Sequence, residues 1–270
     1  METSAERTPE PLVDAFAREH RRRLPGLLGS LVLTGSAMLD DWRPGISDID
    51  LVLITTRPVA ADDLPVIAEL HAVPEAGTQI DGVYLTESQL AAGPDAIEVA
   101  PQVIGGELIP AGEGGELTWV TWCEIENGAE ATVSDGGASA WRPSARRFPG
   151  ALDGARAFSR TNLSTYWARL GSETREKLAG RLETANVNPV AMRWIVLGPA
   201  RLVATVERGL ILSKTDAGRF AARRWPEFED LLSRAVASRA GKDVEFTVHD
   251  ARRAIALLER CVTAAAVDDR

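Results

Sequence analysis

Two carboxylates at the start of an apolar run constrain this chain more than any other feature. Asp48 and Asp50 flank Ile49 and open the segment DIDLVLIT. Alternate residues of a strand point to one face, so a strand over Asp48–Thr55 would carry both carboxylates on the same side. Two unneutralised charges beside a buried strand would be costly. Because carboxylate oxygens bind hard cations, we interpret the pair as metal ligands rather than as exposed acids at a strand edge.

A glycine–serine pair precedes these carboxylates. Gly35 and Ser36 follow a predicted strand at Leu31–Thr34, and eleven residues separate Ser36 from Asp48. Glycine lets the backbone approach a phosphate group closely, and a serine hydroxyl can bind it. Metal and phosphate binding together indicate nucleotidyl transfer, in which a hydroxyl attacks the α-phosphorus of a nucleotide.

This chemistry needs a third carboxylate, and Asp81 is the candidate. The segment TQIDGVYLT predicts the next strand, Thr78–Thr86, with Asp81 on the same face as Val83 and Leu85. From there Asp81 would complete the metal site or take the proton of the attacking hydroxyl. The alternative is that Asp81-Gly82 forms a turn.

The chain changes character near its middle. Gly, Ser and Pro are frequent between Ser134 and Gly154, which predicts a boundary between domains at 1–150 and 151–270. A loop is predicted at Gly105–Gly115, and Trp119–Asn127 is a short helix or strand. Beyond the boundary the apolar spacing predicts helices at Ala155–Leu170, Val190–Gly209, Thr215–Trp225, Glu227–Arg239 and Val248–Ala266. The expected fold is therefore α+β, a mixed sheet with helices followed by an all-helical domain.

Composition and net charge limit the kinds of substrate and cellular location that we expect for this chain. The net charge of −9 argues against a long nucleic-acid substrate. The two cysteines are far apart and form neither a disulfide framework nor a metal motif. The N-terminal residues do not resemble a secretory signal, and no apolar run suggests a membrane span. We expect a cytoplasmic monomer.

These motifs resemble the nucleotidyltransferase superfamily that includes DNA polymerase β. The stretch GSAMLDDWRPGISDIDLVLIT is similar to the aminoglycoside nucleotidyltransferases that adenylylate streptomycin and spectinomycin. The likeness continues in VLGPARLVATVERGLILSKTDAGRFAARRWP, where an arginine is followed by a glycine eight residues later and a lysine thirteen residues later. In this chain they are Arg201, Gly209 and Lys214.

The resemblance implies a role for each matching residue. Gly35, Ser36 and Ser47 would contact the phosphates of ATP, while Asp48 and Asp50 would hold Mg²⁺. Asp81 stands where the close relatives carry a glutamate as general base. Arg201 and Lys214 would reach from the helical domain to the triphosphate, which suits a fork-shaped donor and a point cation. The implied reaction moves AMP from ATP to a hydroxyl of a small molecule, with antibiotic resistance as the implied role.

The acceptor is left open by the sequence. The relatives place acids, which grip amino or guanidino groups of the drug, one to three turns before the position of Arg201, whereas Asn186–Met192 contains no acid. Trp194 is expected on the same helix face as Arg201. Glu124 and Glu126 could line the cleft, but the favoured interpretation places both on a solvated helix face. Two alternatives remain: the same transfer to a protein or RNA, as in toxin–antitoxin systems, and a non-catalytic nucleotide-binding protein.

Overall fold

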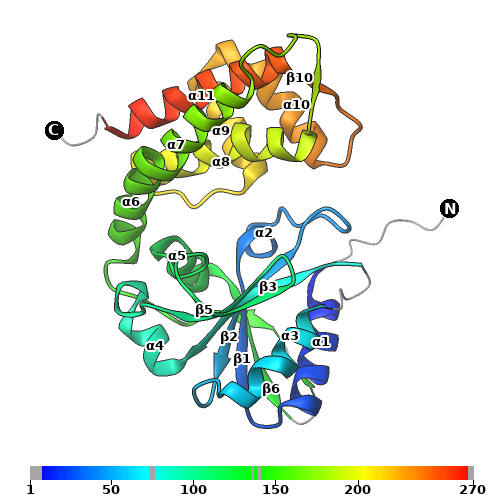
Figure 1. Cartoon of the computed structure of the whole chain (residues 1–270). Helices are drawn as coiled ribbons and strands as arrows, with labels where there is room; N and C mark the ends of the chain where they lie inside the picture. Colours follow the sequence, from blue (N-terminus) through cyan, green and yellow to red (C-terminus); the bar gives the residue numbers. More distant parts are fainter. Residues whose placement is uncertain (1–7, 73–76, 135–136, 139–140, 267–270) are drawn as a thin grey trace. The chain divides into compact units, whose positions relative to one another are not determined.

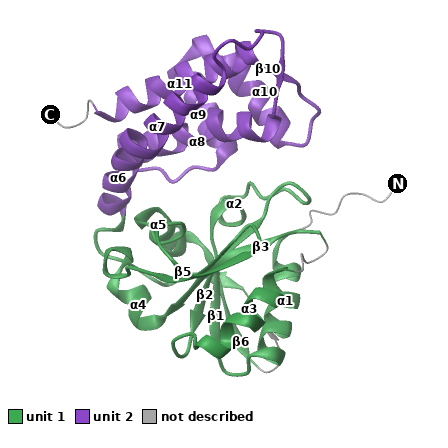
Figure 2. Cartoon of the chain, viewed as in Figure 1, with its two compact units in different colours: residues 1–151 green, residues 152–270 purple. Residues whose placement is uncertain are grey.

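A computed structural model describes residues 8–72, 77–134, 137–138 and 141–266 of the chain. The chain divides into two compact units, Met1–Ala151 and Leu152–Arg270, drawn in different colours in Figure 2. We describe each unit by itself.

The first unit is built on a mixed eight-stranded sheet (Figure 1). The strand order is β5-β4-β3-β2-β1-β6-β7, and β8 also pairs with β6. Strands β2 and β3 are parallel, and the other pairs are antiparallel. The strands are β1 Leu28–Leu33, β2 Ile49–Thr55, β3 Ile80–Thr86, β4 Ala100–Ile104, β5 Glu107–Gly112, β6 Ala129–Ser134, β7 Gly137–Ala138 and β8 Arg142–Pro143.

Helices α1 (Glu10–Arg23) and α3 (Leu64–Ala72) cover one face of this sheet. Their apolar residues form one core with the strand residues that point toward them, among them Leu51 and Leu53 of β2 and Tyr84 of β3. Strand alternation therefore directs Asp50 and Asp81 to the opposite face. The unit also contains α2 (Gly35–Met38), α4 (Glu87–Ala92), α5 (Trp119–Asn127) and the short turns η1 (Ala61–Asp63) and η2 (Pro94–Ala96).

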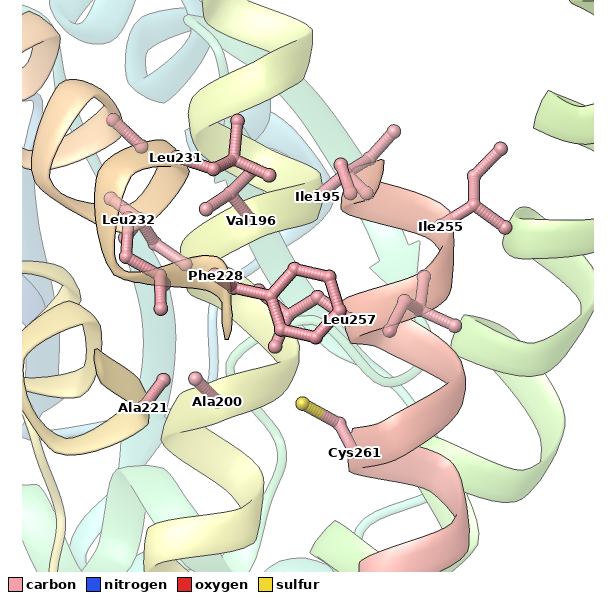
Figure 3. Packing of buried hydrophobic residues seen from close by; sticks show 14 of the residues in the cluster. Ile195, Val196, Ala200, Ala221, Phe228, Leu231, Leu232, Ile255, Leu257 and Cys261 are labelled. Carbon is pink, nitrogen blue, oxygen red and sulfur yellow. The ribbon is translucent and has the colours of Figure 1, made fainter. Parts of the chain in front are cut away.

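The second unit is a helical bundle. Its elements are α6 Ala151–Asn162, the π-helical turn η3 Leu163–Trp167, α7 Ala168–Lys177, α8 Pro189–Arg208, α9 Lys214–Arg224, η4 Pro226–Phe228, α10 Glu229–Arg239 and α11 Val248–Ala266. Figure 3 shows the centre of its core, where Val196 and Ala200 of α8 meet Leu231 of α10 and Leu257 of α11. Of the described helices, only α8 is long and apolar enough to span a bilayer. However, 61% of its most apolar window is buried against the rest of the protein, as in the core helix of a soluble protein.

The predicted α+β class is confirmed, with two local corrections. The predicted loop Gly105–Gly115 instead contains β5, because Gly105 and Gly106 form only the turn of a β4–β5 hairpin. The helical half is not wholly helical, since Asn186–Val187 (β9) pairs with Phe246–Thr247 (β10). Asp81-Gly82 lies inside β3 and is not a turn.

Candidate active site

Asp50 and Asp81 lie side by side on the open face of the sheet. They are register partners in the parallel pair β2–β3. Neighbouring strands are about 4.8 Å apart, so the two carboxylates project from adjacent positions. Asp48 lies just before β2 with an exposed side chain, and its charge acts on both. The structure therefore brings together the three carboxylates predicted from the sequence.

The turn after β1 closes over Asp50. The amide N–H of Thr34 donates to the carbonyl oxygen of Asp50 at 3.0 Å. Gly35 has a φ of +56°, and a Cβ at this position would lie 2.1 Å from Oδ2 of Asp50. Only glycine fits such a conformation and such an approach, so the backbone of the Gly-Ser turn rests directly on the carboxylate.

Two hydroxyl groups in this turn are buried without a hydrogen-bond partner within the described residues. They belong to Thr34 and Ser36. Buried polar groups are nearly always paired, so an unpaired hydroxyl beside a predicted phosphate site fits a ligand that supplies the missing partner. Ser47 differs, because its Oγ accepts the amide N–H of Arg43 at 3.2 Å.

Glu124 is a member of the site that the sequence interpretation assigned wrongly. Its side chain is 4% exposed, and Oε2 accepts the amide N–H of Gly35 at 3.0 Å. The expected solvated face does not exist, since five consecutive residues of α5, from Thr121 to Ile125, are buried. The available signal was a lone carboxylate inside the run WVTWCEI, because a buried acid needs a partner.

Glu116 is a second acid that sequence reasoning did not place. It precedes α5, and its Oε2 accepts the hydroxyl of Thr121 at 3.3 Å. We call Asp50 and the four carboxylates whose charges act on it the acidic cluster: Asp48, Asp50, Asp81, Glu116 and Glu124.

The acidic cluster places four carboxylates close enough to act on Asp50. Burial raises the pKa of Asp50 well above its usual range, and the charges of Glu116, Asp48, Glu124 and Asp81 raise it further. A bound cation would remove this cost, which is the electrostatic setting of a metal site.

Asp81 is held in place by a glycine turn. Its Oδ2 accepts the amide N–H of Gly105 at 2.6 Å, and its Oδ1 accepts that of Gly106 at 3.1 Å. Burial raises the pKa of Asp81, and Asp48 raises it further, while the two backbone donors act in the opposite direction. A raised pKa makes this carboxylate a better proton acceptor than a solvated aspartate.

The second unit brings its own predicted residues together. The Nε of Arg201 on α8 donates to the carbonyl oxygen of Leu212 at 2.9 Å. Lys214 opens α9, and its Nζ lies 5.3 Å from the centroid of the Trp194 ring. Gly209, with a φ of +66°, ends α8 and permits the turn between these two helices.

Comparison with known families decides the identity. Residues 13–98 match the nucleotidyltransferase domain. Residues 170–264 match the C-terminal domain of aminoglycoside adenylyltransferase. The chain is a nucleotidyltransferase whose helical half matches the C-terminal domain of aminoglycoside adenylyltransferase.

A solved structure supports the same fold for this nucleotidyltransferase. It is similar to the crystal structure of spectinomycin adenyltransferase AAD(9) from Enterococcus faecialis with ATP and spectinomycin. The TM-score is 0.60 at 14% identity, over 95% of this chain and all of that one. No curated protein matches the sequence.

The carboxylate groups of this nucleotidyltransferase are suitable ligands for magnesium, but their side chains are spread apart. All five members of the acidic cluster offer carboxylate oxygens, the ligands that Mg²⁺ prefers. Within the described part of the chain, however, no three acidic, histidine or cysteine side chains converge closely enough to hold a metal ion as they stand. The assignment of Asp48, Asp50 and Asp81 as metal ligands stays a prediction.

Proposed function

We propose that this chain transfers AMP from ATP to a hydroxyl group of a small-molecule antibiotic of the aminoglycoside type. The observation that carries the proposal is the placement of Asp50 beside Asp81 under the Gly35 turn, in a chain with both adenylyltransferase-family domains. The match to the C-terminal domain favours a small molecule over a protein or RNA acceptor, and over a non-catalytic role. We expect the enzyme to be a cytoplasmic monomer.

In the proposed reaction the acceptor oxygen attacks the α-phosphorus of ATP. A new P–O bond forms, the bond from the α-phosphorus to the bridging oxygen breaks, and pyrophosphate leaves with that oxygen. Asp81 takes the hydroxyl proton, for which its backbone hydrogen bonds orient it and its raised pKa suits it. Mg²⁺, held by Asp48, Asp50 and Asp81, would neutralise phosphate charge and polarise the phosphoryl group.

The residues that we assign to the phosphates of ATP are Gly35, Ser36, Ser47, Arg201 and Lys214. Gly35 supplies backbone at the turn, and Ser36 supplies a buried hydroxyl that lacks a partner within the described residues. The hydroxyl of Ser47 accepts the amide N–H of Arg43. To bind a phosphate, this hydroxyl would either lose that hydrogen bond or donate its own proton to the phosphate while keeping it. Arg201 and Lys214 would bind the triphosphate as a bidentate fork and a point charge.

The test is a pyrophosphate-release screen. ATP, GTP, CTP and UTP are each offered with spectinomycin, streptomycin, other aminoglycosides and a set of cell metabolites. We expect release with ATP and at least one antibiotic, and a product that carries one AMP by mass spectrometry. Asp50→Asn should abolish release, whereas Asp62→Asn, at an exposed position of η1, should not. If Mg-ATP neither stabilises the protein nor yields pyrophosphate with any acceptor, the proposal is wrong.

A further inference from the structure

A buried amide side chain, that of Gln102, lies on the same face of the sheet as Asp81. Gln102 belongs to β4, where it is the register partner of Val83 in β3, and it is fully buried. Asp81 precedes Val83 by two positions, so strand alternation directs Asp81 and Gln102 to one face. A buried amide needs partners for both its oxygen and its nitrogen. The partners of Gln102 therefore show what this side chain organises.

Both partners of Gln102 belong to the loop that leads from β5 to α5. Its Nε2 donates to the carbonyl oxygen of Gly114 at 3.2 Å, and its Oε1 accepts the amide N–H of Glu116 at 3.2 Å. Gly115, between them, has a φ of +58°, and a Cβ at this position would overlap Oε1 of Gln102. The amide thus fills the space beside the loop and fixes the backbone on both sides of Gly115.

The loop held in this way carries Glu116 of the acidic cluster. The charge of Glu116 acts on Asp50 more strongly than the charge of any other member of the cluster. Oε2 of Glu116 accepts the hydroxyl of Thr121 in α5 at 3.3 Å, so hydrogen bonds hold both the backbone and the side chain of Glu116. A carboxylate fixed beside a predicted metal ligand adds attraction for a divalent cation, and this attraction depends on its distance.

We infer that Gln102 is a positioning residue of the cation site, which fixes the loop that directs Glu116 toward Asp50, and that the charge of Glu116 strengthens the binding of Mg²⁺. The inference rests on the proposed function. It adds to the predicted site two residues that lie outside the Gly-Ser and Asp-x-Asp motifs, and Gln102 acts there through Glu116.

Thermal melts of the whole chain in a titration with Mg²⁺ test the role of Glu116. Glu116→Gln removes the charge and keeps an oxygen for the Thr121 hydroxyl. We expect it to raise the Mg²⁺ concentration for half-maximal stabilisation about fivefold. Glu113→Gln makes the same change at an exposed position of the same loop and should shift this midpoint less than about twofold. An equal shift in both variants would overturn the inference, because any acid of the loop would then act alike.

The role of Gln102 is tested by disturbing the loop in two backgrounds. Gly115→Ala places a methyl group against Oε1 of Gln102, and Gln102→Met removes the amide. We expect each to raise the Mg²⁺ midpoint about three- to fivefold. Gly114→Ala, at a φ of +60° with open space around its Cβ, adds backbone strain without this contact and should shift the midpoint less than about twofold.

In the Glu116→Gln background the loop has no charge to direct, so Gly115→Ala should shift the midpoint by less than about twofold more. Equal shifts of Gly115→Ala in the two backgrounds would show that the loop supports only the fold, and this result would overturn the role of Gln102.

Pyrophosphate release separates failure of the inference from failure of the proposed function. The Mg²⁺ concentration for half-maximal release should rise in Glu116→Gln together with the melting midpoint, whereas the KM for spectinomycin should stay within about twofold. A wild type that Mg²⁺ stabilises, with an unchanged midpoint in Glu116→Gln, overturns the inference alone. If Mg²⁺ does not stabilise the wild type, the metal assignment fails and the inference fails with it. If the wild type also releases no pyrophosphate with any antibiotic, the proposed function fails as well.

Discussion

The amide N–H of Gly35 donates a hydrogen bond to Oε2 of Glu124 across 3.0 Å. The bond ties the turn after β1 to helix α5, elements separated by 89 positions in the sequence. The same glycine lies against Oδ2 of Asp50, so Glu124 and Asp50 hold it from two sides. The conformation of the predicted phosphate-binding turn therefore depends on a carboxylate outside the metal-binding motif.

Removing this carboxylate should loosen the turn. In Glu124→Leu the Gly35 amide loses its acceptor in a part-buried position, which costs about 1–3 kcal/mol. If half of that cost falls on nucleotide binding, we expect the KM for ATP to rise by a factor of about 2 to 12. Steady-state kinetics with varied ATP at saturating acceptor measures this change.

Glu124→Gln provides the matched control, because its amide oxygen can still accept the Gly35 N–H. The KM for ATP should then stay close to that of the wild type. Since Glu124 raises the pKa of Asp50, loss of its charge should also move the acidic limb of the kcat profile to lower pH. Equal effects of Glu124→Leu and Glu124→Gln on the KM for ATP would show that charge, and not the hydrogen bond, is what matters.

Gly35→Ala should be more damaging than any conservative change in the same turn. The added methyl would lie 2.1 Å from Oδ2 of Asp50 and would also strain a φ of +56°. Activity should fall at least about a hundredfold, as misplacement by an ångström can cost that much. Gly45→Ala, at another positive φ but with open space around its Cβ, isolates the backbone strain from the clash. A Gly35→Ala enzyme as active as Gly45→Ala would contradict this geometry.

The acidic cluster should destabilise the folded protein, and this destabilisation should increase as the pH rises. Because the folded-state pKa of Asp50 is raised, the folded protein holds this proton more tightly than the unfolded chain, so stability declines as pH rises above the ordinary carboxyl value. Asp50→Asn removes that cost. Without metal we therefore expect the Tm of Asp50→Asn at pH 8 to be higher than that of the wild type, where each 1 kcal/mol gained is worth about 2–4 °C in a chain of this size.

The gain should shrink toward pH 4, where the Asp50 carboxyl of the unfolded chain is also about half protonated. Thermal melts in EDTA from pH 4 to pH 8 follow it. Added Mg²⁺ should stabilise the wild type and leave Asp50→Asn nearly unchanged, since the variant lacks one predicted ligand. A variant that is less stable than the wild type at pH 8 without metal would show that the Asp50 charge is compensated.

The sequence predicted the parts of the site that local patterns encode. Asp50 and Asp81 lie on strands whose alternation could be read directly, so their shared face followed once the strands were assigned. Glu124 could not be placed in this way, because its partner Gly35 is distant in sequence and the hydrogen bond exists only after α5 docks. The two backbone donors to Asp81 were missed for the same reason, since Gly105 and Gly106 looked like loop rather than a hairpin turn.

The helical half was predicted closely because its helices have marked apolar periodicity. The helix predicted at Glu227–Arg239 begins two residues later in the structure, and the one at Val248–Ala266 agrees throughout. The π-helical turn at Leu163–Trp167 was not foreseen, because an extra residue in one turn leaves no separate sequence pattern. Its effect appears only in packing, where Trp167 meets Gly198.

The first unit contains a buried histidine pair that should make it sensitive to acid. His20 on α1 is fully buried, and neither ring nitrogen has a hydrogen-bond partner within the described residues. Its ring stacks on Tyr84 at 5.8 Å, and the hydroxyl of Tyr84 lies 2.9 Å from Nε2 of His71. Burial lowers the pKa of each histidine to about 4, and for His20 the charge of His71 contributes.

Between the ordinary histidine value of 6.5 and about 4, the unfolded chain binds these protons and the folded chain does not. Stability is therefore fully present above 6.5 and falls as pH decreases through this window, by about 1.4 kcal/mol per pH unit for each histidine. His20→Leu should halve that slope and lose little stability at pH 7, because the buried imidazole has no hydrogen bond to give up. Urea unfolding of the whole protein at pH 7, 6 and 5 measures the slope. The control variant His249→Asn, at an exposed position of α11, should leave the slope of stability against pH unchanged. If His20→Leu has the same slope as the wild type, His20 gains its proton in the folded state as readily as in the unfolded chain.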